Sequence, residues 1–163
     1  ADVDAIRQYN PQRFEMEQLT AIIYEDADRH VCVGHKDLTA DEFWVRGQGS
    51  HPIMPAVLMC EAAGQLANYY ALRHRLYAVQ GGFVGLKGVR YRRIAKPGER
   101  LFVIARLLKI RSTLLTCQFQ CAVGRRVVCD GVLIGGGAAW MKDQEHDASL
   151  TTVAGMDVGF QGG

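Results

Sequence analysis

Long apolar runs are missing from this chain. No stretch approaches the roughly 20 residues that a membrane-spanning helix needs. The opening ADVDAIRQYN has neither the basic nor the apolar region of a signal peptide. The five cysteines are odd in number and form no CxxC pair, so neither a disulfide framework nor a zinc site is indicated. We expect reduced core thiols, no metal, no cofactor and a cytoplasmic location.

A strong excess of one charge is also absent. The net charge is +2, with 48% hydrophobic and 22% charged residues, as in an ordinary globular protein. Basic residues gather between positions 87 and 111, where Glu99 is the only acid. Without an aromatic stacking motif this local excess does not indicate nucleic-acid binding. The 163 residues suffice for one domain, which we place at 1–141, followed by a polar, Gly-rich, flexible tail at 142–163.

The pattern of apolar residues predicts one long helix among strands. Pro55 favours a helix start, and apolar residues surround the segment 56–77 on nearly all sides, which indicates burial. A short helix is expected near the N-terminus, and two β-rich runs flank the polar turn at 25–28. Four more strand-like segments follow the helix, separated by turns at 96–99, 111–112 and 124.

This order of elements predicts an α+β hot-dog fold, because a sheet must curl around a helix that is buried on most sides. In that fold an antiparallel sheet wraps around one long central helix. A single unit would leave a sheet edge exposed. We therefore expect two units to form a homodimer with one continuous sheet.

Four segments occur in the order IRQYNPQRFEME, TADEFWVRG, PIMPAVLMCEAAGQ and GFVGLKGVRYRRIAKPGERL. Together they resemble the 3-hydroxyacyl-ACP dehydratase (FabZ-like) family of fatty-acid synthesis, over roughly residues 5–138. The resemblance implies a lyase that eliminates water from a 3-hydroxyacyl thioester to give a trans-2-enoyl thioester. It implies an acyl carrier protein (ACP) or CoA thioester as substrate, and a homodimer whose further assembly into a trimer of dimers is left open.

The resemblance also implies roles for single residues. In the family a His and a Glu of two subunits face each other, and Glu61 stands at the position of that Glu. The alternative for Glu61 is a solvated helix face. Backbone N–H groups at the helix start would polarise the thioester carbonyl. The residues implied to contact the substrate are Ala56, Val57, Gln65, Phe83 and Gly85.

The loop before the helix departs from the family pattern. The family has Gly-His-(Phe/Ile)-Pro-x-x-Pro, whereas this chain has GQGSHP and is one residue shorter. The family His falls on Gln48 or on Gly47, depending on the anchor, and neither is a general base. His51 is either a relocated base or a surface histidine beside a proline. The alternatives to a dehydratase are a non-catalytic acyl-chain or acyl-carrier binding homologue and a hot-dog thioesterase.

Arg90, Arg92 and Arg93 lie on a predicted strand, where alternation would place Arg90 and Arg92 on one face. By resemblance they border the tunnel mouth at which ACP docks. Positive charge there would steer an acidic carrier. The alternative is an ordinary charged surface.

Overall fold

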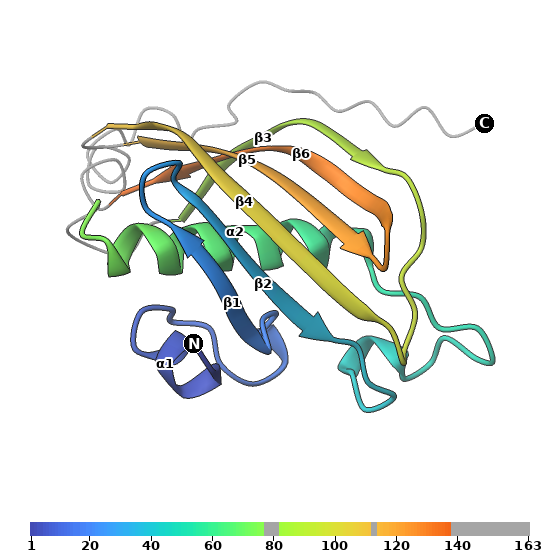
Figure 1. Ribbon diagram of the computed structural model, residues 1–163. Coiled ribbons are helices and arrows are strands. Elements are labelled where there is room, and N and C mark those ends of the chain that lie inside the picture. The colour runs from blue at the N-terminus through green and yellow to red at the C-terminus, as the bar shows by residue number, and fades with distance from the viewer. Residues whose placement is uncertain (77–81, 112–113, 138–163) are drawn as a thin grey trace, which may run out of the picture.

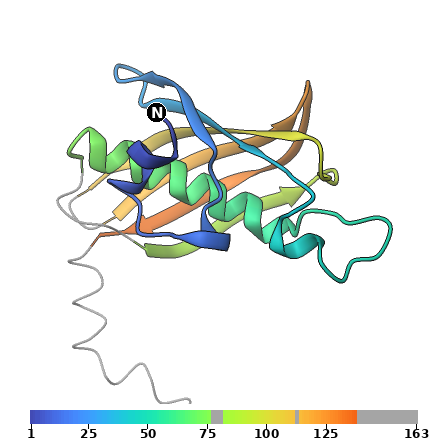
Figure 2. The same ribbon diagram turned by 90° about the horizontal axis from the view of Figure 1, so that it is seen from below.

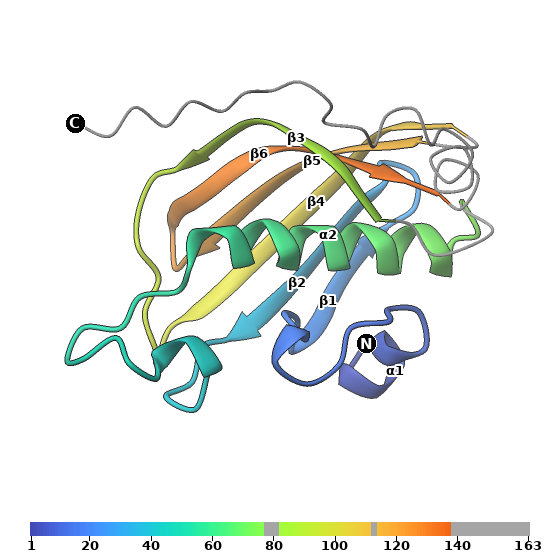
Figure 3. The same cartoon turned by 180° about the vertical axis from the view of Figure 1, so that it is seen from behind.

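A computed structural model describes residues 1–76, 82–111 and 114–137 (Figure 1). The long helix α2 (Ala56–Arg73) lies across one face of a six-stranded antiparallel sheet with the order β1-β2-β4-β5-β6-β3 (Figures 1 and 3). The predicted hot-dog fold is thereby confirmed. The other elements are α1 (Val3–Arg7), η1 (Phe14–Met16), β1 (Ala21–Asp26), β2 (Val31–Asp37), η2 (Phe43–Val45), β3 (Gly82–Tyr91), β4 (Arg100–Ile110), β5 (Leu114–Val123) and β6 (Arg126–Gly136).

Helix α2 forms the centre of the hydrophobic core, and small and large side chains alternate along it. Ala62, Ala63 and Leu66 are each 0% exposed. Pro55 is the N-cap rather than the first helical residue, and the helix ends at Arg73 rather than at the predicted position 77. The early end has a local cause, because Arg75 adopts a left-handed conformation with φ 55° that terminates the helix.

Strand β3 is one edge strand of the sheet, opposite β1, and it pairs with β6 among the described residues. Its side chains are exposed along most of its length, including the large apolar residues Phe83, Val84 and Leu86. The prediction that Arg92 and Arg93 belong to this strand is wrong, since the strand ends at Tyr91. A register shift before Arg90, with Gly88 at φ 58°, also breaks the simple alternation of faces.

All five cysteines are free and buried, as the sequence indicated. In the described parts of the chain no helix is long and apolar enough to cross a membrane. The predicted tail at 142–163 lies outside the described residues. Figure 2 shows α1 and the segment after it on the same side of the sheet as α2, where they cover part of the helix.

Candidate active site

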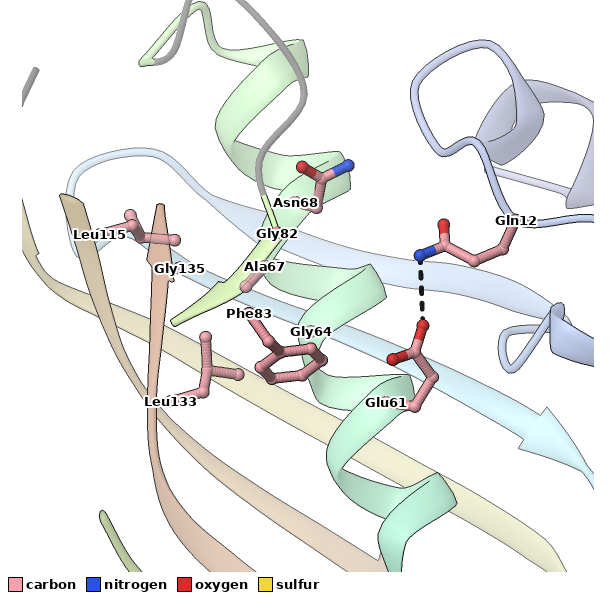
Figure 4. A pocket seen from close by; sticks show the side chains of 10 residues that line it. All are labelled: Gln12, Glu61, Gly64, Ala67, Asn68, Gly82, Phe83, Leu115, Leu133 and Gly135. Carbon is pink, nitrogen blue, oxygen red and sulfur yellow. Dashed lines mark hydrogen bonds between the residues drawn. The ribbon is translucent and has the colours of Figure 1, made fainter. Parts of the chain in front are cut away.

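Glu61 is half-buried in the second turn of α2, and protein amides hold its carboxylate. Gln65 Nε2 donates to Glu61 Oε1 at 2.8 Å, and Gln12 Nε2 donates to the same oxygen at 3.1 Å. Figure 4 shows the other carboxylate oxygen on the side of Phe83. Glu61 is therefore fixed in one orientation by Oε1, with Oε2 directed toward a hollow in the surface.

Gln65 attaches the N-terminal segment to the helix. Its Oε1 accepts the backbone N–H of Gln18 at 2.9 Å, and its Nε2 also donates to the carbonyl of Met16 at 2.6 Å. Asn10 Nδ2 donates to the Gln65 carbonyl at 2.9 Å. Because Gln65 is only 3% exposed, these hydrogen bonds are shielded from water and fix the segment that carries Gln12.

Two mostly apolar hollows meet at Glu61. Their empty volumes, including space open to solvent, are about 510 and 860 Å³. The first hollow is lined by Gln12, Glu61, Gly64, Ala67, Asn68, Gly82, Phe83, Leu115, Leu133 and Gly135 (Figure 4). The second hollow is lined by Met16, Val57, Leu58, Cys60, Glu61, Phe83, Val84, Gly85 and Leu86. An apolar chain with a polar group placed at Glu61 would fit such a surface.

The start of α2 opens beside the second hollow. The backbone N–H groups of Ala56 and Val57 have no acceptor among the described residues, since the cap residue Pro55 offers no side-chain hydrogen bond. Val57 is 63% exposed and lies one turn before Glu61. The structure thus brings Val57, Phe83 and Gly85 to the hollows at Glu61, whereas Ala56 lines neither of them.

The loop that differs from the family pattern is held by Gln48. Gln48 Nε2 donates to the carbonyls of Trp44 at 2.7 Å and Ile53 at 3.0 Å, and Gln48 Oε1 accepts the Ile53 N–H at 3.1 Å. Gly47 has φ 84°, and a Cβ at this position would meet nothing within 4 Å. Gln48 is therefore a bridge within the loop, and Gly47 leaves open space.

His51 is exposed at the tip of the same loop, with its Nδ1 2.8 Å from Ser50 Oγ. The loop extends beyond the N-terminal end of α2 in Figures 1 and 3. Neither hollow at Glu61 has a histidine in its lining. Nor do three His, Cys, Asp or Glu side chains of the described segments gather in a way that could hold a metal ion.

Two groups near Glu61 were not singled out in the sequence as site residues. Gln12 lies 49 positions away from Glu61, so no local pattern could reveal the contact. Cys60 lines the second hollow, and its Sγ is 3.5 Å from Tyr91 Oη. A hydrogen bond from Cys129, together with that of Tyr91, lowers the pKa of Cys60 to about 7. The position of Cys60 directly before Glu61 in the sequence could have identified it as a site residue.

The three predicted docking arginines are exposed at the end of β3. Arg92 forms an ion pair with Asp130 and holds the pKa of that carboxyl below its usual value. The Arg92 charge is thus partly neutralised by β6. Arg90 and Arg93 remain on the surface on either side of it.

Comparison with known proteins places the chain among acyl dehydratase relatives. A family model described as a FabA-like domain matches residues 10–133. The 3-hydroxyacyl-[acyl-carrier-protein] dehydratase FabZ of Desulforamulus reducens is 30% identical over 135 residues, which are 82% of this chain and 94% of that protein. The protein of the same name from Caldicellulosiruptor bescii is 27% identical over 82% of this chain and 96% of its own length.

Two solved structures show the same fold. The dehydratase heterocomplex ApeI:P from Xenorhabdus doucetiae matches with a TM-score of 0.73 and 15% identity, over 86% of this chain and 96% of the matched chain. A hypothetical thioesterase with coenzyme A from Streptococcus pneumoniae matches with a TM-score of 0.57 and 10% identity, over 72% of this chain and 84% of the matched chain. At these identities the likeness shows the fold alone.

Proposed function

The chain belongs to the family of FabA-like domains, and on that premise we propose that it binds a 3-hydroxyacyl thioester at Glu61 and takes part in the elimination of water. The observation that carries the proposal is the Glu61 carboxylate. One oxygen is held by the amides of Gln12 and Gln65, while the other lies at an apolar hollow. The product would be a trans-2-enoyl thioester.

The chemistry assigns separate tasks to the helix and to its acid. A base removes the proton from C2, the C2–C3 double bond forms, and the C3 hydroxyl leaves as water with a proton from Glu61. The thioester carbonyl gains negative charge during this step. The N–H groups of Ala56 and Val57 at the start of α2, which have no acceptor among the described residues, would stabilise this charge.

We further propose that the base is not supplied by the chain that carries the acid. Gln48 is engaged within its own loop, Gly47 has no side chain, and His51 lines neither hollow at Glu61. In related enzymes the histidine that acts as base is expected to belong to the partner subunit. A mixed dimer with a histidine-bearing chain of the same family would meet this need, and the solved structure from Xenorhabdus doucetiae is a dehydratase heterocomplex of this fold.

Imidazole rescue tests this proposal directly. Hydration of a C4 trans-2-enoyl thioester is followed by its ultraviolet absorbance for wild type, Glu61→Gln, His51→Ala and Glu15→Gln, with and without imidazole. Glu15→Gln is the matched control, because Glu15 is exposed and lines neither hollow at Glu61. We expect low wild-type activity that imidazole raises in every protein except Glu61→Gln.

The other outcomes discriminate between the alternatives. Wild-type activity without imidazole that disappears in His51→Ala would identify His51, of the same chain or of a second copy, as the base and refute the mixed dimer. Binding of the thioester without turnover, even with imidazole, would favour an acyl-binding protein, for which the altered loop is the supporting observation. Absence of both binding and turnover would overturn the proposed function as a whole.

A further inference from the structure

The aromatic ring of Phe83 lies where the two hollows meet. Glu61 and Phe83 are the residues that both linings share. Figure 4 shows the ring between the helix at Gly64 and the sheet at Leu133, on the side of Glu61. A chain that follows the helix from the second hollow to the first must therefore pass Phe83.

Two glycine positions allow the ring to occupy this place. An added Cβ at Gly64 would lie 2.5 Å from Phe83 Cζ and 2.8 Å from Cε2, so only glycine lets the ring approach the helix this closely. On the neighbouring strand β6, Gly135 is the register partner of Phe83 and presents no side chain that would displace the ring. A register shift follows directly, between Phe83 and Gly85.

We propose that Phe83, packed on Gly64, is the residue that limits the length of the acyl chain. This inference rests on the proposed function. With the thioester at the start of α2 and the C3 hydroxyl at Glu61, the carbons beyond C3 reach the ring first. The apolar surface behind it, at Ala67, Leu115 and Leu133, is then closed to them.

Shortening the side chain at position 83 should join the two hollows. Each methylene that gains a buried position contributes about fourfold in affinity. A C8 chain has four more methylenes than a C4 chain. Incomplete burial reduces the theoretical gain, so the C8:C4 affinity ratio should rise by about tenfold or more in Phe83→Ala, and by less in Phe83→Leu.

The test measures dissociation constants of C4, C8 and C12 saturated acyl-pantetheine thioesters by calorimetry. Wild type, Phe83→Ala and Phe83→Leu are compared with Lys87→Ala, a matched control because Lys87 is an exposed residue of the same strand that lines neither hollow. We expect the ratio to rise in both Phe83 variants and to stay at the wild-type value in Lys87→Ala. Phe83→Leu keeps an apolar side chain on β3, so the comparison survives if the alanine variant folds poorly.

The outcomes separate the two proposals. Equal C8:C4 ratios in wild type and both Phe83 variants would overturn the role of Phe83, while the binding itself would still support the proposed function. An equal rise in Lys87→Ala would overturn it too, because the effect would then belong to the strand and not to the ring. Failure of every protein to bind any of the thioesters would overturn both proposals.

Discussion

Replacement of Gly64 by alanine should change the stability of the protein in opposite directions, depending on residue 83. In wild type the new methyl group would lie 2.5, 2.8 and 3.4 Å from three atoms of the Phe83 ring, so the ring must move. In a Phe83→Ala background that contact is gone. The same substitution then only replaces a glycine in the middle of α2 by a better helix former.

The expected magnitudes follow from these two effects. Gly→Ala in a helix interior stabilises by about 0.5–1 kcal/mol. Overpacking costs about 1–3 kcal/mol, and the lower half applies here because Phe83 is 44% exposed and has room to yield. Gly64→Ala should therefore lower the unfolding free energy by about 1 kcal/mol in wild type and raise it by about 0.7 kcal/mol in Phe83→Ala.

Thermal and urea unfolding of the four proteins, at one protein concentration, measures this double-mutant cycle. We expect a coupling free energy of about 1.5–2 kcal/mol, with Tm changes of about 2–4 °C per kcal/mol. A common protein concentration matters because association would shift the apparent stability. If Gly64→Ala stabilises both backgrounds equally, the Phe83 ring does not rest on Gly64, and the explanation of how Phe83 separates the two hollows is refuted.

Three further substitutions test other parts of the site. Gln65→Ala removes the acceptor of a buried backbone N–H and should lower the free energy of unfolding by about 2 kcal/mol. Urea denaturation measures this loss, with the exposed Gln120→Ala as control. Equal losses in the two variants would contradict the role of Gln65 in attaching the N-terminal segment to α2. Gln48→Ala should speed proteolysis within the loop 46–54, while the global free energy of unfolding falls by less than about 1 kcal/mol. An unchanged cleavage rate would show that the three hydrogen bonds of the Gln48 side chain do not hold the loop. Cys129→Ala removes the main hydrogen bond that lowers the pKa of Cys60 to about 7. The pH midpoint of Cys60 alkylation, followed by mass spectrometry, should therefore rise. A midpoint that stays near 7 would contradict this cause of the low pKa.

The sequence pattern was sufficient for the architecture because periodicity and turns are local properties. A helix that is apolar on all sides must be enclosed, and strands before and after it leave few ways of doing so. The motif around Glu61 likewise identified the family, and it predicts the catalytic role of Glu61. For the flanking loop, the resemblance predicts Gln48 or Gly47 at the position of the family histidine.

Element ends were predicted less well, since single residues decide them. Arg75 in the left-handed region terminates α2, and the bulge at Gly88 changes which faces of β3 its side chains occupy. Neither conformation follows from hydrophobic periodicity, which averages over several residues.

By itself the sequence determined the fold class and the family, and it predicted the role of Glu61 and the replacement of the family histidine. Only the tertiary structure decided what surrounds that acid. Gln12 reaches Glu61 across 49 positions, and Phe83 of the edge strand settles on Gly64 of the helix. Such contacts arise when distant segments pack together, and their partners are set by the shape of the whole core rather than by any local pattern.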